Sequence, residues 1–85
     1  MSWEIVWTDE AVADMRRLDR IVAHRVRQAI HRLAETGYGD VKRLKGREDE
    51  WRLRVGDWRV KFTYHKSAGR MEILNVWPRK DAYRN

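Results

Sequence analysis

Hydrophobic and polar residues alternate most regularly over residues 51–64, which read WRLRVGDWRVKFTY. Alternation on both sides of a Gly-Asp pair predicts two strands joined by a two-residue turn, and a glycine at the first turn position suits a type II′ hairpin. A two-residue turn also fixes which residues face one another across the strands. The predicted pairs are Val55 with Trp58, Arg54 with Arg59, Leu53 with Val60, Arg52 with Lys61 and Trp51 with Phe62.

This register separates the predicted hairpin into two faces of opposite character. One face is apolar and must be buried; it carries Trp51, Leu53, Val55, Trp58, Val60 and Phe62. The other face is cationic and carries Arg52, Arg54, Arg59 and Lys61. Because like charges opposite one another destabilise a sheet, we expect this face to bind an anion such as a phosphate backbone. The alternative is a basic face that is only solvated.

Two helices are predicted between residues 8 and 37. Thr8 is a favourable N-cap, and the helix dipole stabilises the two acidic residues that follow it. A second helix begins near Asp19 and ends at Gly37, which can adopt the left-handed conformation that closes many helices. Each helix carries an apolar stripe, with Val12, Met15 and Leu18 in the first and Val22, Val26, Ala29, Ile30 and Leu33 in the second. The outward side of the second helix is basic, with Arg20, Arg25, Arg27 and Arg32.

The remaining segments complete an α+β fold. Residues 3–7 alternate as a strand, and residues 71–77 form a last strand that ends before Pro78, because proline cannot donate to a ladder. Residues 41–50 are expected to be a polar connector, and residues 79–85 a short charged tail beside the sheet. The predicted fold is a small antiparallel sheet backed by an N-terminal helical hairpin, in the order β-α-α-β-β-β, within one domain that spans residues 1–85.

Composition restricts the kind of partner. The chain has 85 residues, 19 Lys and Arg against 13 Asp and Glu, and a net charge of +6, which suits nucleic acid or an acidic protein. A domain of this size has little room for a large ligand cavity, so function is expected on a surface. No long apolar run or signal peptide indicates membrane attachment. The absence of cysteine excludes thiolate chemistry and fits a reducing cytoplasm.

Several familiar catalytic arrangements are missing from the sequence. There is no Ser-His-Asp set, no glycine-rich phosphate loop and no zinc-ligand spacing. The acidic run Glu48, Asp49 and Glu50 could be read as a set of metal ligands, but adjacent carboxylates in a loop are more often solvated. His24, His31 and His65 are expected to be surface residues. We therefore expect no metal and no cofactor, and the candidate functional groups are arginine, lysine and tyrosine side chains.

Two motifs together resemble the RelE/ParE superfamily of type II toxin-antitoxin toxins. They are WRLRVGDWRV at residues 51–60 and RKDAYR at residues 79–84, and the resemblance covers essentially the whole chain. It implies a small sheet backed by a helical hairpin. In the RelE branch it also implies metal-free cleavage of mRNA in the ribosomal A site, where the ribose 2′-hydroxyl attacks the adjacent phosphate. The products are a 2′,3′-cyclic phosphate and a free 5′-hydroxyl.

The resemblance also implies which residues work in the site. Catalytic roles fall on Arg52 and Arg54 before the turn, Arg59 as a phosphate-binding residue, Arg79 near the leaving 5′-oxygen and Tyr83 as the residue that stacks on or orients the substrate. Further RNA contacts are expected from Lys61, Lys45, Lys80 and Arg84. The well-studied RelE branch has lysine at the first two positions, and an arginine cannot replace lysine as a general base. Trp77-Pro78 stands where relatives often carry small residues and a His or Lys, which removes one candidate acid.

The implied partners are a cognate acidic antitoxin and the ribosome with its mRNA, in the cytoplasm. Operator DNA is expected to be contacted only indirectly, through the antitoxin, and no membrane is involved. Two other functions stay open: a ParE-type poison of DNA gyrase that is not a nuclease, and a non-catalytic module that binds nucleic acid or antitoxin. The nuclease is favoured because a basic sheet face together with Arg79 and Tyr83 would be an unneeded set in a gyrase binder.

Overall fold

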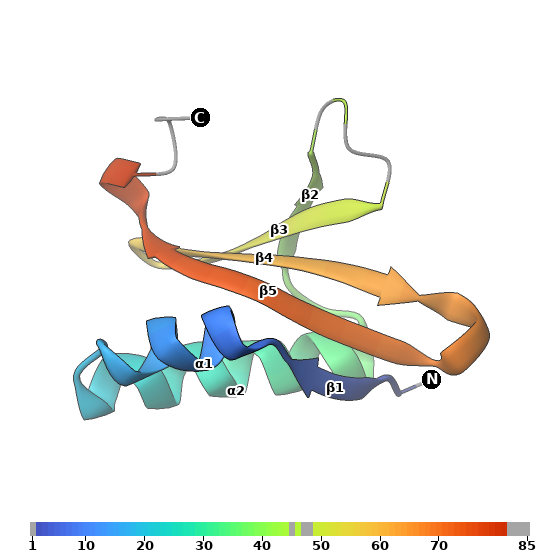
Figure 1. Cartoon of the computed structure of the whole chain (residues 1–85), viewed down its shortest axis with the longest axis horizontal. Helices are drawn as coiled ribbons and strands as arrows, with labels where there is room; N and C mark the ends of the chain where they lie inside the picture. The colour runs from blue at the N-terminus through green and yellow to red at the C-terminus, as the bar shows by residue number, and fades with distance from the viewer. Residues whose placement is uncertain (1, 45, 47–48, 82–85) are drawn as a thin grey trace.

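Helices and sheet form two layers around one core, in a computed structural model that describes residues 2–44, 46 and 49–81. The elements are β1 (Glu4–Trp7), α1 (Asp9–Arg16), α2 (Arg20–Thr36), β2 (Asp40–Arg43), β3 (Glu50–Val55), β4 (Trp58–His65), β5 (Arg70–Pro78) and the 3-10 turns η1 (Lys66–Ala68) and η2 (Arg79–Asp81). The sheet has the strand order β1-β5-β4-β3-β2, with both helices along one side (Figure 1). Neither of these helices is long and apolar enough to cross a membrane.

The central hairpin is confirmed in every predicted pair. β3 and β4 pair antiparallel, and all five residue pairs named from the sequence are Cα partners. Gly56 has a φ of 57°, whereas no described residue other than glycine has a positive φ. A type I′ turn would require a positive φ at Asp57 as well, so the turn belongs to the type II′ class that the sequence predicts.

The helix boundaries also agree with those predicted from the sequence. The Thr8 side chain caps α1 by accepting from the N–H of Ala11, and Asp19 caps α2 by accepting from that of Val22. Gly37 closes α2 in the left-handed conformation with a φ of 80°. The stripe of α2 is buried as predicted at Val26, Ile30 and Leu33, whereas in α1 the fully buried residue is Ala11 rather than a member of the predicted stripe.

A strand that the sequence analysis missed lies in the expected connector. β2 pairs antiparallel with β3, with Val41 opposite Leu53 and Lys42 opposite Arg52. The connector prediction is therefore wrong for residues 41–43. The prediction failed because β2 is an edge strand. Charged side chains are common in edge strands, and one apolar residue is enough to reach the core.

The sheet is mixed rather than wholly antiparallel, because β1 pairs parallel with β5. Beyond the end of β1, α1 lies along the same edge of β5 (Figure 1). The Thr8 hydroxyl donates to the Ile73 carbonyl at 2.9 Å, and Asp14 Oδ2 accepts from the Val76 N–H at 2.8 Å. These side chains therefore satisfy backbone groups of β5 that a longer neighbouring strand would otherwise pair.

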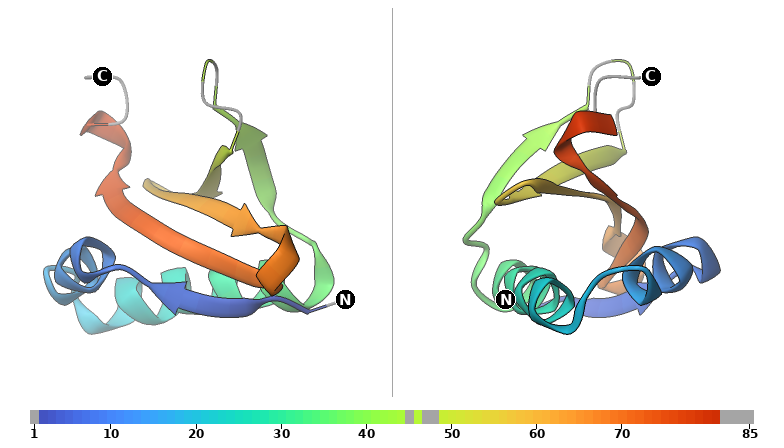
Figure 2. Two further views of the ribbon diagram at one scale, coloured as in Figure 1. Left: turned by 45° about the vertical axis from the view of Figure 1, so that its right-hand side comes forward. Right: turned by 90° about the vertical axis from the view of Figure 1, so that its left-hand side faces the viewer.

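The core lies between α2 and the inner face of the curved sheet, which bends toward the helices (Figure 2). Its largest fully buried side chains are Phe62, Ile30, Leu53, Met71, Ile73, Val26 and Val60. Burial of each such side chain stabilises the fold by about 1.5–3 kcal/mol. The predicted apolar face of the hairpin is thus confirmed, although its tryptophans, Trp51 and Trp58, are only half-buried.

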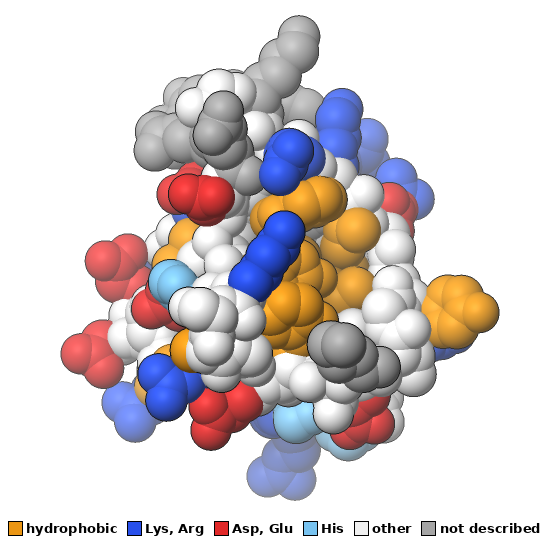
Figure 3. Space-filling view, turned by 90° about the vertical axis from the view of Figure 1, so that its right-hand side faces the viewer, with side chains coloured by type: hydrophobic (Ala, Val, Ile, Leu, Met, Phe, Trp, Pro, Cys, Tyr) orange, Lys and Arg blue, Asp and Glu red, His pale blue; other side chains and the backbone are white. Residues whose placement is uncertain are grey.

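Aromatic side chains cover one end of this core. The Tyr64 ring lies 4.5 Å from that of Trp3 and 6.1 Å from that of Trp51, measured between ring centroids. Figure 3 faces the end at which Trp3 and Trp51 lie and shows hydrophobic side chains gathered in a hollow. Burial raises the pKa of the Tyr64 phenol above its ordinary value, so this hydroxyl stays protonated at neutral pH.

We expect Thr8→Val to lower the free energy of unfolding by about 1–2 kcal/mol, because the cap of α1 is lost together with the hydroxyl bond to β5. Thr36→Val is the matched control, since its exposed hydroxyl donates to the Arg32 carbonyl and accepts from the Tyr38 N–H at the end of α2 and bonds to no other helix or strand. Urea denaturation followed by circular dichroism measures both. Equal losses in the two variants would contradict the tertiary role of Thr8.

Candidate functional site

The cationic residues predicted from the hairpin lie on the outer face of the sheet, away from the helices. Alternation along β3 and β4 places Arg52, Arg54, Arg59 and Lys61 opposite the buried apolar residues. We call these four residues the cationic face. η2 and the far end of β2 both extend from this side of the sheet (Figure 2). The cationic face is thus bordered by two segments that are distant in sequence.

Two members of the cationic face have carboxylate partners. Arg54 Nε lies 3.2 Å from Asp40 Oδ2, and Lys61 Nζ lies 3.8 Å from Glu50 Oε1. The Arg54 pair is exposed, and such pairs contribute about 0–1 kcal/mol. The expectation of an uncompensated cationic surface is therefore corrected at these two positions. The sequence analysis missed the partners because Asp40 belongs to the unpredicted strand β2 and Glu50 was assigned to the connector.

Arg59 is placed differently from the rest of the cationic face. Only 5% of the residue is exposed, and its Nη1 donates to the carbonyls of Gly56 and Trp58, both at 2.9 Å. These bonds fasten the guanidinium to the hairpin turn that precedes it. The sequence analysis placed Arg59 on an open face, and the structure shows that it is buried and supports the turn.

Three cations form a row across the centre of the site. Lys42 on β2 is opposite Arg52 on β3, which is opposite Lys61 on β4. Neither Lys42 nor Arg52 forms an ion pair with any residue that the structure describes. The sequence analysis missed Lys42 because β2 was not predicted, although its alternation with Val41 was the available signal. Because no described carboxylate pairs with Lys42 or Arg52, an anion gains free energy by binding at this part of the row.

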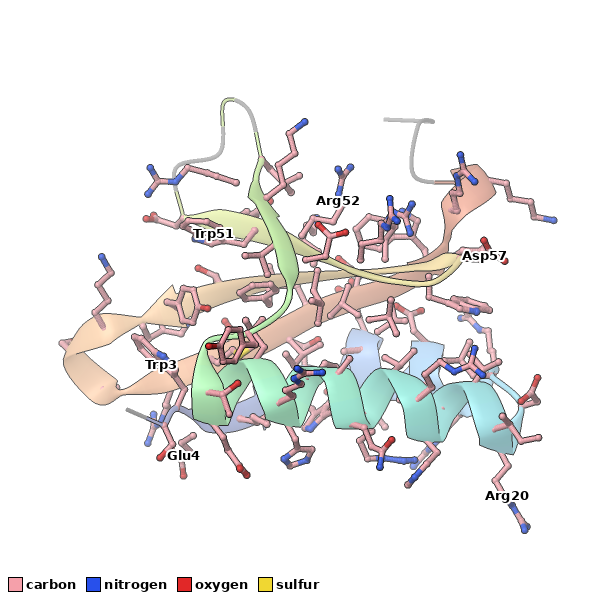
Figure 4. The ribbon with its side chains drawn as sticks, turned by 180° about the vertical axis from the view of Figure 1, so that it is seen from behind. Trp3, Glu4, Arg20, Trp51, Arg52 and Asp57 are labelled. Carbon is pink, nitrogen blue, oxygen red and sulfur yellow. The ribbon has the colours of Figure 1, made fainter. Side chains whose placement is uncertain are left out.

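A backbone hydrogen bond brings the C-terminal motif to the hairpin. The Arg79 N–H donates to the Asp57 carbonyl at 2.6 Å, which places η2 beside the β3–β4 turn, as the label on Asp57 shows (Figure 4). Arg79 and Lys80 are both exposed. Trp77 is opposite Arg59 on the neighbouring strand β5, so it shares the outer face. The structure thus places the described start of the C-terminal motif, residues 79–81, at one end of the cationic face.

Three of the predicted site residues, Lys45, Tyr83 and Arg84, lie outside the described residues. No group of three His, Asp or Glu side chains could hold a metal ion within residues 2–44, 46 and 49–81. His65 lies at the far end of β4, where its Nε2 is 2.9 Å from Glu72 Oε1. The described cations can bind a phosphate and stabilise charge that develops on it.

Arg59→Ala should lower the free energy of unfolding by about 2 kcal/mol, because two charge-assisted bonds to the turn are lost. The domain should still fold. Arg54→Ala is the matched control on the facing strand, and removal of its exposed ion pair should change stability by no more than about 1 kcal/mol. Urea titration of both variants measures the difference. A loss for Arg54→Ala as large as that for Arg59→Ala would contradict the role of Arg59 in holding the turn.

Comparison with known proteins identifies relatives of the whole chain. A family described as the ParE toxin of the type II toxin-antitoxin system, parDE, matches residues 5–83. No curated protein sequence matches at a significant level.

Several solved structures are similar in fold. An archaeal RelE–RelB complex from Pyrococcus horikoshii matches with a TM-score of 0.79 and 24% identity, over 96% of this chain and 100% of that one. The RelBE2 toxin-antitoxin complex from Mycobacterium tuberculosis matches with a TM-score of 0.83 and 19% identity, over 95% of both chains. The isolated RelE toxin of E. coli matches with a TM-score of 0.77 and 12% identity, over 91% of this chain and 84% of that one. At these identities the likeness shows a shared fold.

Proposed function

This chain belongs to the ParE toxin family of type II toxin-antitoxin systems, and within that family we propose that it acts as a metal-free mRNA endonuclease in the ribosomal A site. The observation that carries the proposal is the row of Lys42, Arg52 and Lys61 on the outer face of the sheet. Its central member has no carboxylate partner among the described residues, and η2 brings Arg79 to the same hairpin. A phosphate backbone laid over the face would meet cations from three strands and from η2.

In the proposed reaction the ribose 2′-oxygen attacks the adjacent phosphorus while the bond from phosphorus to the 5′-oxygen breaks. The 2′-hydroxyl gives up its proton and the leaving 5′-oxygen gains one, so the products are a 2′,3′-cyclic phosphate and a 5′-hydroxyl. Arginine stays protonated at neutral pH and therefore does not accept this proton. Arg52, Arg54 and Arg79 therefore bind the phosphate and stabilise the negative charge that grows on its oxygens.

The other site residues support this chemistry in the proposal. Arg59 holds the hairpin turn in place, and the part of its guanidinium that the two turn carbonyls leave unused would contact the phosphate. Tyr83 would stack on or orient a base. Lys61, Lys45, Lys80 and Arg84 would bind the RNA backbone on either side of the cut.

A cognate antitoxin is the partner that family membership implies, and several similar structures are toxin-antitoxin complexes. With a net charge of +6, this toxin is best complemented by an acidic antitoxin. Action on translating ribosomes places the protein in the cytoplasm, and operator DNA would be reached only through the antitoxin.

The second candidate is a poison of DNA gyrase without nuclease activity. The description of the matching family favours it, since that family is named for ParE toxins. The ion pairs of Arg54 and Lys61 and the burial of Arg59 also leave fewer open cations than a dedicated RNA surface would offer. Against it stands the row through Arg52, which gyrase binding would leave without a purpose. A third candidate, a non-catalytic binding module, has the same surface but no cleavage.

Induction of the toxin in cells separates these functions. If the protein is a ribosome-dependent nuclease, we expect new RNA 5′ ends within translated messages within minutes of induction. These ends should be in register with codons. Sequencing of RNA ends and an assay for the DNA-damage response are run on the same culture. A DNA-damage response with intact messages would overturn the nuclease in favour of the gyrase poison, and bound RNA without cleavage or damage would favour the binding module.

A further inference from the structure

The outer face of the sheet carries a large aromatic side chain that the proposed reaction does not use. Trp77 lies on β5, is half-buried and has Arg59 as its Cα partner on β4. Four of the five tryptophans pack against the hydrophobic core, namely Trp3, Trp7, Trp51 and Trp58. Trp77 is not among the side chains that pack against the described core. Core packing therefore does not explain why an indole stands at this position.

A β-bulge turns Trp77 onto the outer face. Met71 and Ile73 are both fully buried and lie two residues apart, as strand alternation requires, but the next buried residue is Val76. The cause is a register shift in the pairing of β4 with β5, which leaves Leu74 without a partner on β4. Without this extra residue, alternation would direct Trp77 to the same side as Ile73, into the core. Bulges commonly re-aim a side chain beside a functional site.

Side chains from α1 hold the bulge from the other edge of β5. The Thr8 hydroxyl lies 2.9 Å from the Ile73 carbonyl oxygen and 3.1 Å from that of Leu74. Asp14 Oδ2 accepts from the Val76 N–H at 2.8 Å. The backbone on both sides of the bulge thus has specific partners, and the outward direction of the next residues is fixed by the fold.

Cations surround Trp77 on the outer face. Arg59 is directly opposite, Lys61 is the next outward-facing residue along β4, and Arg79 begins η2 two residues after the indole. Side chains directly opposite one another on a sheet have Cβ atoms about 4.5–5.5 Å apart. Figure 4 shows η2 rising beside the turn that Asp57 marks. None of the close ring–ring or cation–ring pairs among the described residues involves Trp77.

A single aromatic ring among cations matches the chemistry of a nucleotide. The phosphate pairs with arginine and lysine, and the base presents a flat π surface that stacks on an indole. A protein partner would need a wider apolar area to gain much by contact with this ring, because the residues next to it on the face are charged.

We propose that Trp77 stacks on the base of the nucleotide that carries the leaving 5′-oxygen. The inference rests on the proposed function, in which Arg79 lies near that oxygen, and Arg79 is two residues from Trp77 along the chain. A purine has a larger ring surface than a pyrimidine, and preferences of this kind follow stacking strength. The indole therefore gives the site a preference for a purine directly after the cut.

Affinity for ribosomes programmed with an uncleavable mRNA tests the stacking. A 2′-deoxy sugar at the attacking position removes the nucleophile, so binding is measured without reaction. One mRNA carries a purine at the next nucleotide and a second carries an abasic residue there. Trp77→Leu removes the ring, Trp77→Phe keeps a smaller ring, and Trp7→Leu is the matched control at a half-buried tryptophan on the edge strand β1. Thermal melts first establish that all variants fold.

With the purine present, we expect Trp77→Leu to bind about tenfold more weakly than the wild-type protein, and the other two variants to stay within about threefold. With the abasic mRNA, the wild-type protein and Trp77→Leu should agree within about twofold, because no base remains to be stacked. The loss should therefore appear only when both the indole and the base can be present.

The abasic mRNA separates contact with RNA from a structural role. Equal losses for Trp77→Leu with and without the base would mean that the indole only holds Arg59 in place, and would overturn the proposal. Unchanged affinity of Trp77→Leu for the purine mRNA would also overturn it. Cleavage of unmodified mRNA is scored separately: a wild-type protein that binds but does not cleave overturns the nuclease, while the binding comparison still decides the stacking. A wild-type protein that binds neither mRNA overturns both.

Discussion

The register of the β3–β4 hairpin is the constraint on which both the buried apolar face and the cationic face depend. The Gly56-Asp57 turn fixes that register, and a slip of one residue would exchange the buried and the cationic faces. Arg59 fastens the turn from its own strand, and the Asp57 carbonyl receives the N–H of Arg79. One short turn thus orients the core residues, aligns the cations and holds the start of the C-terminal motif.

The sequence was sufficient wherever a local pattern determined the structure. The alternation of residues 51–64 gave every cross-strand pair, and Thr8, Asp19 and Gly37 marked helix ends correctly because caps depend on neighbouring backbone groups. Strand β2 was missed because an edge strand can be almost wholly polar. The parallel pairing of β1 with β5 was missed because it depends on how distant segments meet rather than on local periodicity.

The candidate site was predicted less completely than the fold, for a related reason. Residue type and alternation place a cation on a face, but they do not show which carboxylate reaches it. Asp40 and Glu50 reach Arg54 and Lys61 only because β2 and the start of β3 lie beside them. The Arg59 side chain folds back and donates to carbonyls at the β3–β4 turn, which alternation alone does not indicate. What persists is Arg52 between Lys42 and Lys61.

In the proposed function the outer sheet face binds the reacting phosphate, and a single substitution tests this role directly. Arg52→Ala is compared with Arg70→Ala, which removes an exposed arginine that pairs with Glu4 at another edge of the sheet. Initial cleavage rates are measured on mRNA-programmed ribosomes with purified toxin. Loss of one preorganised charge at a reacting phosphate predicts a rate about 100-fold lower for Arg52→Ala and an unchanged rate for Arg70→Ala. A wild-type rate for folded Arg52→Ala would contradict the claim.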